Sequence, residues 1–329
     1  MIISRTPYRI SFFGGGTDYP LWYHENGGRV ISVTINKYCY ILARLLPQVF
    51  PYNNRIRYFK TEETKTIQEI LHPSVRETCL HLNIEEGIEI VHSGDLPAQS
   101  GLGTSSAFTV GLLNSLWGLK GYMPTKRELA ETAIHIEQNR IKEIVGSQDQ
   151  TAAAFGGLNA ISFAKTGRIE VDNIILCKKR ISELQNNLLL CFTGFSRTAS
   201  EIEAEKIKNL SSKKYELTQM LQVCEEALNI LVSEKASLDC FGKLLNEQWL
   251  LKKALSPIIT NKHIDEIYEC AKSNGALGGK ILGAGSGGFF LIYAPFETHN
   301  RIKESLKEKL FVPLRFDFTG SKIIYFSHD

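Results

Sequence analysis

The sequence predicts an α+β protein with two domains. Its 329 residues exceed the roughly 250–300 at which a single hydrophobic core usually divides. Apolar residues make up 43% of the chain and charged residues 22%, so the protein can form a packed core. Segments typical of strands and segments typical of helices both occur, but they do not alternate as regularly as in a βαβ protein.

The first half of the chain combines strands with helices. β-branched and aromatic runs predict strands within residues 2–45, a hairpin region at 47–65, and strands at Ile88–Val91, Leu158–Phe163 and Leu188–Phe192. Helical spacing predicts a helix at Ile67–Leu82. Thr125 as N-cap, with Glu128 three residues later, predicts a capping box and a helix through about Ile144. Small residues at 146–157 predict a loop and a short helix.

The segment Leu96–Leu119 contains no charged residue and is long enough to be considered as a membrane span. It begins with Pro97 and a glycine-rich turn, and it includes several polar side chains. We therefore expect a loop that leads into a fully buried helix ending near Lys120.

After about residue 195 the pattern becomes mainly helical. Apolar residues recur at spacings of four and three, the stripe of an amphipathic helix, at Leu217, Leu221, Cys224, Leu228 and Leu231. The further elements expected are helices at 238–255 and 261–274, a glycine-rich loop at 278–288, a strand at Phe289–Tyr293, a charged helix at 297–309, and strands at Val312–Phe318 and Lys322–Phe326.

Charge and cysteine content exclude several classes of function. The net charge of +3 is scattered, and no run of five basic residues indicates nucleic-acid binding. The seven cysteines are spread singly without a C-x-x-C pair, so neither a disulfide framework nor a zinc site is indicated. The segment Met1–Pro7 lacks the apolar core of a signal peptide. We expect a cytoplasmic protein that binds neither nucleic acid nor a membrane; the sequence does not indicate its oligomeric state.

The loop Gly101–Ser106 precedes a predicted helix and is typical of an anion site. Backbone N–H groups of such a loop and of the helix N-terminus converge on a phosphate. Hydroxyls at the helix entrance can add hydrogen bonds or bind magnesium. No lysine follows the glycines, so this is not a Walker A loop. A simple glycine turn with a serine cap is the structural alternative.

A second glycine-rich loop, Gly283–Gly288, does not match a dinucleotide-binding motif. That motif must follow a strand and open a helix, whereas this loop follows a helix and precedes a strand. We expect its backbone to approach a ligand or the loop at 101–106 closely, with tight turning alone as the alternative.

Two aspartates lie where a carboxylate has either a structural or a chemical role. Asp18 ends a third glycine-rich loop, which starts at Phe13, and by default is a solvated turn residue. Asp149 lies among small and uncharged residues, where it is either a helix cap or a functional group.

Together these segments resemble the motifs of the GHMP kinase superfamily, which includes galactokinase, homoserine kinase, mevalonate kinase and phosphomevalonate kinase. The three motifs occur in the family's order at Pro7–Tyr19, Leu96–Ala107 and Lys280–Gly288, and with the Asp149 loop they span most of the chain. Within the superfamily, Arg5–Pro20 and Ile35–Tyr38 look like the D-glycero-D-manno-heptose 7-phosphate kinases.

The chain departs from other members in two motifs, and the first departure bears on the substrate. Galactokinase has an acid and a histidine where this chain has Gly15 and Gly16, which argues against galactose. The second motif has Gly103-Thr104-Ser105-Ser106 where other members have three serines.

The resemblance implies a fold and a division of the chain. An N-terminal domain, residues 1–180, would have the fold of ribosomal protein S5 domain 2 and would bind ATP. A ferredoxin-like C-terminal domain would comprise residues 181–329, with the active site in the cleft between the two.

The resemblance also implies roles for individual residues. The ATP phosphates would be bound by Gly101, Leu102, Gly103, Thr104, Ser105 and Ser106. Mg²⁺ would be held by Ser106 and Glu137. Asp149 would orient or deprotonate the attacking hydroxyl, and Arg9 would stabilise the developing charge. The sugar would be bound by Gly15, Gly16, Asp18 and Tyr19.

The leading hypothesis is an ATP-dependent kinase for the anomeric (C1) hydroxyl of heptose 7-phosphate, giving the 1,7-bisphosphate for nucleotide-activated heptose and surface glycan synthesis. Arg197 is the candidate ligand for the substrate's phosphate, with a surface arginine at a helix start as the alternative. Another sugar such as L-fucose is the second hypothesis. The third, a non-catalytic regulator that binds sugar and ATP, conflicts with the presence of Arg9, Ser106 and Asp149.

Overall fold

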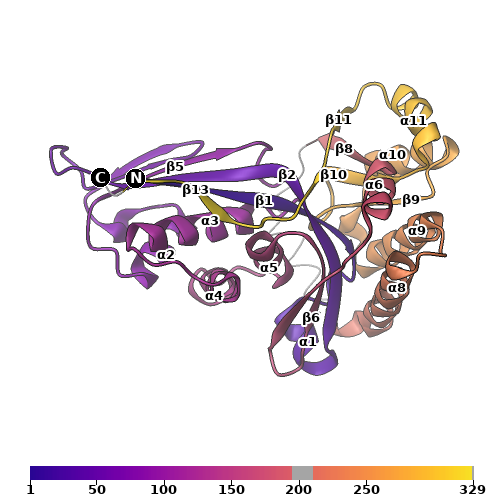
Figure 1. Cartoon of the computed structure of the whole chain (residues 1–329), viewed down its shortest axis with the longest axis horizontal. Coiled ribbons are helices and arrows are strands. Elements are labelled where there is room, and N and C mark those ends of the chain that lie inside the picture. Colours follow the sequence, from indigo (N-terminus) through magenta and orange to yellow (C-terminus); the bar gives the residue numbers. More distant parts are fainter. Residues whose placement is uncertain (195–209, 328–329) are drawn as a thin grey trace.

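The computed structural model describes residues 1–194 and 210–327. Within these ranges the chain forms two β-sheets, each with helices packed against it (Figure 1). Arg197 lies outside the described residues. Met1 and Ser327 exchange two backbone hydrogen bonds, so the ends of the described chain lie side by side.

The first sheet is organised around one long strand, β2 (Gly28–Leu45), which pairs with four others. The strand order of this sheet is β13–β1–β2–β5–β3–β4. Outside this order, β6 and β12 pair with β2, and β7 pairs with β6. The remaining bounds are β1 (Ile2–Phe13), β3 (Asn54–Arg57), β4 (Thr61–Thr64), β5 (Ile88–Gly94), β6 (Leu158–Phe163), β7 (Ile169–Asn173), β12 (Phe316–Asp317) and β13 (Lys322–Phe326). The predicted strands, the hairpin β3–β4 and the strand at 158–163 are confirmed.

One helix interrupts the predicted run of strands at 2–45. The helix α1 (Pro20–Asn26) follows the glycine-rich loop that starts at Phe13, with Pro20 in its first turn and Gly27 at its C-cap. Proline at the start and glycine just past the end of a helix match the preference of helix termini, so the sequence contained this signal.

Helices cover one face of the first sheet (Figure 1). They are α2 (Pro73–His81), α3 (Thr104–Leu119), α4 (Lys126–His135) and α5 (Gln148–Phe155). The uncharged segment forms α3, as expected, and α3 packs on β1 and β2 beneath α2, α4 and α5. Its interior position explains why the segment contains no charge: nearly every side chain from Ser106 to Leu116 is buried.

Two of the predicted helices differ in extent. The predicted helix at Ile67–Leu82 is a short 3₁₀ turn, Ile67–Glu69, followed by α2, because Pro73 cannot continue a helix and instead begins one. The N-cap Thr125 is confirmed, since its side chain accepts a hydrogen bond from the Glu128 amide. However, α4 ends at His135 and continues as one turn of π-helix, residues 136–140, instead of running to Ile144.

The second sheet is antiparallel, with the order β11–β8–β10–β9. Its strands are β8 (Leu188–Gly194), β9 (Gly278–Ile281), β10 (Gly288–Tyr293) and β11 (Leu310–Val312). The accompanying helices are α6 (Lys178–Asn186), α8 (Lys214–Val232), α9 (Leu238–Leu255), α10 (Lys262–Ser273) and α11 (His299–Ser305). Three further 3₁₀ turns are Leu210–Lys213, Pro257–Ile259 and Phe296–Thr298. The predicted helices at 217–231, 238–255 and 261–274 are confirmed, whereas α6 and β7 were not predicted.

Strand β9 occupies the first part of the predicted glycine-rich loop. It is wholly buried and lies between β10 and the helix α9. A Cβ atom at Gly278 would meet the Gly242 carbonyl oxygen at 2.0 Å. The glycines therefore allow a strand to lie against a helix backbone, a packing reason that a count of β-formers does not reveal.

The end of the chain returns to the first sheet. The predicted strand Val312–Phe318 consists of two short strands that join different sheets, β11 beside β8 and β12 beside β2. The final strand, β13, pairs with β1 as the last part of that return. The division at residue 180 stays a prediction; any two-unit division of this fold must assign β12 and β13 to the first sheet.

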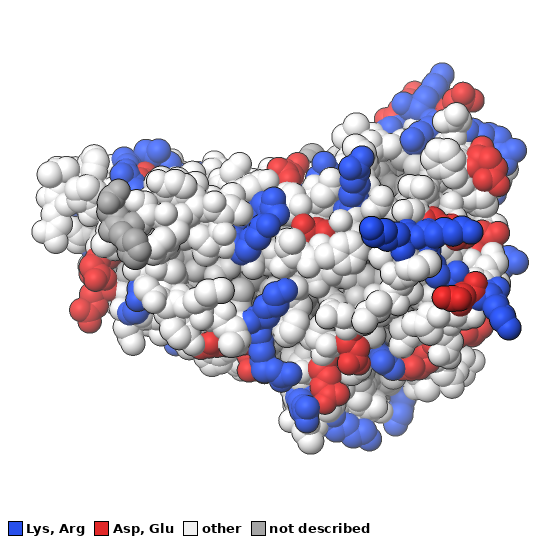
Figure 2. All heavy atoms as spheres, in the orientation of Figure 1, with Lys and Arg blue, Asp and Glu red and all other residues white. Residues whose placement is uncertain are grey.

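The surface and the helices add three observations. On the face shown in Figure 2, basic and acidic side chains are both scattered. None of the helices in the described ranges is long and apolar enough to cross a membrane. All seven cysteines are free thiols, and four of them are buried.

The packing of β9 on α9 can be tested with Gly278→Ala. The added methyl group would contact the backbone of α9, which cannot move away as a side chain can. We expect the free energy of unfolding to fall by about 1–3 kcal/mol, measured by urea denaturation. Gly118→Ala is the matched control, because its methyl group would meet only side-chain atoms, the nearest being the end of the Ile2 side chain. Equal stability of the two variants would contradict this account.

Candidate functional site

A pocket lies where the three glycine-rich loops meet, between residues of β1 and α5 on one side and of α9 and β9 on the other. Most of the predicted site residues line it: Arg9, Gly15, Gly16, Asp18, Tyr19, Gly101, Gly103, Thr104, Ser105, Ser106 and Asp149. Leu102 and Glu137 are buried behind the lining. The Leu102 side chain belongs to the hydrophobic core, so only its backbone could face a ligand.

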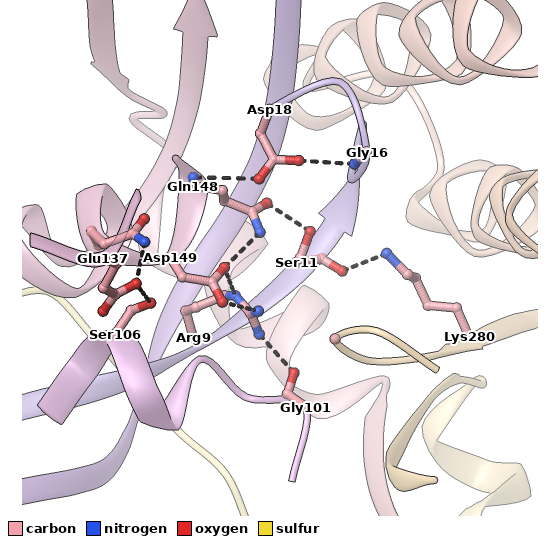
Figure 3. Close-up of polar contacts among 12 residues, drawn as sticks. Arg9, Ser11, Gly16, Asp18, Gly101, Ser106, Glu137, Gln148, Asp149 and Lys280 are labelled. Atoms are coloured by element: carbon pink, nitrogen blue, oxygen red, sulfur yellow. Dashed lines mark hydrogen bonds and ion pairs between the residues drawn. The ribbon is translucent and has the colours of Figure 1, made fainter. Parts of the chain in front are cut away.

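The central contact is an ion pair between Arg9 on β1 and Asp149 in the first turn of α5 (Figure 3). Arg9 Nε donates to Asp149 Oδ1 at 2.6 Å, and Nη2 donates to Oδ2 at 2.5 Å. The third guanidinium nitrogen, Nη1, donates to the Gly101 carbonyl oxygen at 2.7 Å. Arg9 is buried, whereas 26% of the Asp149 side chain is exposed, so the carboxylate faces the pocket.

Gly103 makes room for this ion pair at the start of α3. It is the N-cap of α3 in the left-handed conformation, with φ of 71°. A Cβ atom there would meet Arg9 Cγ at 3.2 Å and Asp149 Oδ2 at 3.3 Å. Glycine at position 103 therefore allows the left-handed turn and also lets the Arg9–Asp149 pair lie close to the N-terminus of α3. Backbone N–H groups and the positive end of the α3 dipole favour an anion at this position.

The second glycine-rich loop packs directly on the first, one of the two alternatives that the sequence left open. A Cβ atom at Gly283 would lie 2.5 Å from the Gly101 Cα atom. The Phe289 amide donates to the Ser100 carbonyl oxygen at 3.1 Å. Lys252 of α9 fastens the loop, since its Nζ donates to the carbonyl oxygens of Ile281 and Gly283 at 2.9 and 2.6 Å.

Asp18 is a buried part of the pocket and not a solvated turn residue. Its Oδ1 accepts from the Gly16 amide at 2.9 Å, and Oδ2 accepts from the Gln148 amide at 3.4 Å. Gly146 lies so close that a Cβ atom there would be 1.9 Å from Asp18 Oδ2. These contacts hold the carboxylate at one end of the pocket, beside the α5 N-terminus.

Several lining residues were not among the predicted site residues. Gln148 lies between Ser11 and Asp149, and Lys280 of β9 donates to the Ser11 and Phe12 carbonyl oxygens at 2.8 and 3.1 Å (Figure 3). Lys280 was part of the third motif, and Gln148 is next to Asp149, so both could have been considered. Lys252 had no signal, because a lysine near the end of a helix is usually a surface residue.

Glu137 and Ser106 are brought together, as the resemblance implied. Glu137 Oε2 accepts from Ser106 Oγ at 2.9 Å and from Gln150 Nε2 at 2.5 Å (Figure 3). The π-helical turn at 136–140 contains Glu137, and such turns are frequent at functional sites. Burial raises the pKa of Glu137 to about 7, although the side chains of Thr109, Gln150 and Ser106 oppose the shift.

These oxygens fit a magnesium ion. Carboxylate and hydroxyl oxygens are its preferred ligands, and Glu137 Oε1 is buried without a hydrogen-bond partner among the described residues. The described residues contain no group of three His, Cys, Asp or Glu side chains able to hold a metal by themselves. Mg²⁺ usually needs only one or two carboxylates when phosphates of a nucleotide complete its shell.

The raised pKa of Glu137 predicts a pH-dependent stability in the metal-free protein. The folded protein binds this proton more tightly than the unfolded chain, so stability is lost as pH rises from 4.5 to about 7. The loss should be on the order of 3 kcal/mol, since one pKa unit corresponds to about 1.4 kcal/mol. The Glu137→Gln variant should not show this loss of stability between pH 5 and pH 8, with the free energy of unfolding measured by urea denaturation in the presence of EDTA. Glu131→Gln, at an exposed position of α4, is the control; a fall in Glu137→Gln as large as in the parent would contradict the assignment.

Two family models and several known proteins match the chain. The model described as the GHMP kinases N terminal domain matches residues 66–157, and that of the GHMP kinases C terminal matches residues 224–311. A D-glycero-α-D-manno-heptose 7-phosphate kinase of Campylobacter jejuni is 30% identical over 338 residues, which cover 98% of this chain and 97% of that protein.

Two further relatives extend the comparison. The bifunctional fucokinase/GDP-fucose pyrophosphorylase of Arabidopsis thaliana is 25% identical over 92% of this chain, which corresponds to 31% of that protein. The crystal structure of a D-glycero-D-manno-heptose 1-phosphate kinase from Bacteroides thetaiotaomicron superimposes with a TM-score of 0.81 at 22% identity, over 99% of this chain and 100% of that chain. The predicted fold class, a two-domain α+β GHMP kinase, is thereby confirmed. The chain belongs to the GHMP kinase family.

Proposed function

We propose that this chain transfers the γ-phosphoryl group of ATP to the anomeric C1 hydroxyl of D-glycero-D-manno-heptose 7-phosphate, giving the 1,7-bisphosphate. The broader class, an ATP-dependent sugar kinase, follows from the family and from its relatives. The observation that best supports the chemistry is the Arg9–Asp149 pair, which lies in one pocket with both the loop at 101–106 and Asp18.

The ATP phosphates would bind at the N-terminus of α3. The loop Gly101–Ser106 presents backbone N–H groups there, and the adjacent Gly283–Gly287 segment lines the same pocket. Magnesium would be held by the Ser106 hydroxyl and the Glu137 carboxylate, which already share a hydrogen bond. When bound, the ion would neutralise phosphate charge during transfer.

Asp149 would hold the attacking hydroxyl. A carboxylate has roughly four acceptor positions, and Arg9 and Gln148 occupy three of them in Asp149. The remaining position on Oδ2 can accept the hydrogen bond of a sugar hydroxyl. Phosphoryl transfer depends mainly on positioning and charge stabilisation, so orientation by Asp149 and the nearby positive charge of Arg9 would provide most of the catalytic effect.

The acceptor would bind at the Asp18 end of the pocket. Asp18, Tyr19, Gly15 and Gly16 all line that end, and a carboxylate is a suitable acceptor for sugar hydroxyls. The heptose 7-phosphate assignment relies on the similarity to the Campylobacter kinase over nearly the whole chain. L-Fucose remains the second candidate because the Arabidopsis fucokinase also matches 92% of the chain.

The catalytic proposal predicts a large effect of Asp149→Asn. This change keeps the shape of the side chain but removes its charge, so kcat should fall by roughly 10²–10⁴ while ATP binding persists. ADP release measures kcat, and titration of the protein with ATP measures binding. Asp172→Asn, at an exposed position of β7, is the matched control. Near-normal turnover of Asp149→Asn would remove Asp149 from the mechanism.

The substrate proposal predicts that the enzyme needs the phosphate of its sugar. Charge-assisted hydrogen bonds to a phosphate contribute about 1.5–3 kcal/mol, so removing it should lower kcat/KM at least about tenfold. The measurement compares heptose 7-phosphate with free heptose, heptose 1-phosphate and L-fucose in the ADP-release assay. If Arg197 binds the phosphate, Arg197→Ala should reduce turnover of the phosphorylated sugar far more than that of the free sugar. Faster turnover of a free sugar would exclude heptose 7-phosphate while leaving the kinase assignment in place.

A further inference from the structure

We infer that Gln148 is a positioning residue for Asp149, and that Ser11 fixes the direction in which the Gln148 amide faces. The inference rests on the proposed role of Asp149. Gln148 Nε2 donates to Asp149 Oδ1 at 3.1 Å, and Ser11 Oγ donates to Gln148 Oε1 at 2.7 Å (Figure 3). Both Gln148 and Ser11 are almost fully buried, at 4% and 5% exposed.

The orientation of this amide follows from the charge of its neighbour. An ionised carboxylate only accepts hydrogen bonds, so the group that faces Asp149 must be the NH₂ end of Gln148. The carbonyl end then faces Ser11, whose hydroxyl can donate. A flipped amide would set two acceptors against each other at Asp149, and Gln148 is only 4% exposed, so water could relieve little of that cost.

Ser11 is itself held by both halves of the pocket. It lies two residues after Arg9 on β1, and alternate residues of a strand face the same side. Its carbonyl oxygen accepts from Lys280 Nζ at 2.8 Å, and Lys280 comes from β9 of the second sheet. The contact between the two sheets therefore helps to hold the Ser11 backbone, from which the hydroxyl reaches Gln148.

The Gln148 hydrogen bond adds a constraint that Arg9 alone does not supply. Arg9 contacts both carboxylate oxygens, whereas Gln148 approaches Oδ1 from the neighbouring position on α5. With two donors on Oδ1, the remaining acceptor position of Asp149 is on Oδ2. Gln148 thus selects the oxygen that would receive the sugar hydroxyl. The backbone amide of Gln148 also donates to Asp18. Gln148 therefore contacts both Asp18, the carboxylate proposed to bind the sugar, and Asp149, the proposed catalytic carboxylate.

Charged and titratable groups near this amide come from several elements, and one of them, Glu137 on the π-helical turn, accepts a hydrogen bond from Gln150 of the same helix α5. Arg9 is on β1, Asp18 and Tyr23 lie before and within α1, and Lys252 and Lys280 line the pocket from α9 and β9. Arginine and lysine retain their charge across the pH range used below. A new carboxyl group at position 148 would therefore face Asp149 directly, with Asp18 as its other acidic neighbour.

The test is the pH dependence of turnover in Gln148→Glu. Above neutral pH the introduced carboxylate would oppose Asp149, and kcat should fall roughly 100-fold. Near pH 5.5 the introduced carboxyl group would be partly protonated, because a neighbouring like charge raises its pKa, and it could donate to Asp149 again. The ratio of variant to parent kcat should therefore rise at least about tenfold between pH 8 and pH 5.5. The KM for ATP should stay unchanged.

Three further variants complete the test: two that remove hydrogen bonds, and one control. Gln148→Met should lower kcat by roughly tenfold at every pH, since it removes the donor without adding a charge. Ser11→Ala should lower kcat by a smaller factor, because Gln148 keeps its hydrogen bond to Asp149 but loses the hydroxyl that holds its carbonyl end. Gln222→Glu, at an exposed position of α8, should behave as the parent. A pH-independent ratio in Gln148→Glu, or parental kcat in Gln148→Met, would overturn the inference.

A double-mutant cycle separates this inference from the proposed function and covers a Gln148→Glu variant that fails to fold. In an Asp149→Ala background, the kcat cost of Gln148→Met should disappear, because the oxygen atom that Gln148 contacts is gone. Additive costs would show that Gln148 acts elsewhere and would overturn the inference. Normal turnover of Asp149→Asn alone would instead refute the proposed mechanism. A severe loss of kcat in Asp149→Asn, together with parental kcat in both Gln148→Glu and Gln148→Met, would refute only the positioning role of Gln148.

Discussion

The guanidinium group of Arg9 joins three parts of the chain that are distant in sequence. It is bonded to Asp149 on α5 and to the Gly101 carbonyl oxygen in the loop before α3, while Arg9 itself belongs to β1. A planar group with fixed donor directions defines both distance and angle between its partners. The strand, the loop and the helix therefore reach the pocket in one relative arrangement, and the catalytic proposal depends on it.

Glycine makes this arrangement possible because three backbone segments must approach more closely than side chains permit. Gly101 and Gly283 face each other across the loops, and Gly103 gives space to the ion pair. Lys280 then fastens the second sheet to the first through carbonyl oxygens of β1, and Lys252 of α9 holds the glycine-rich loop that follows β9. Burial of Glu137 behind Ser106 is the opposing cost, since an ionised carboxylate destabilises the folded state until a cation binds.

The sequence predicted those features that depend on local pattern. The α8 stripe, the buried α3 helix and the N-cap Thr125 all follow from spacing or capping chemistry. Features that depend on tertiary packing were missed. Strand β9 is buried because its glycines fit against α9, and the return of β13 to β1 is set by the whole fold. In the site, motifs gave the loops and Arg9 with Asp149, whereas the contacts of Gln148 with Ser11 and of Lys252 with Ile281 form only when elements distant in sequence meet.

The most direct test of the central claim is a crystal structure with heptose 7-phosphate and a non-hydrolysable ATP analogue bound together. The account predicts that the C1 hydroxyl lies within hydrogen-bond distance of Asp149 Oδ2 and points at the γ-phosphate, with the phosphates at the N-terminus of α3. A sugar bound with another hydroxyl at Asp149, or phosphates bound away from the loop Gly101–Ser106, would contradict it.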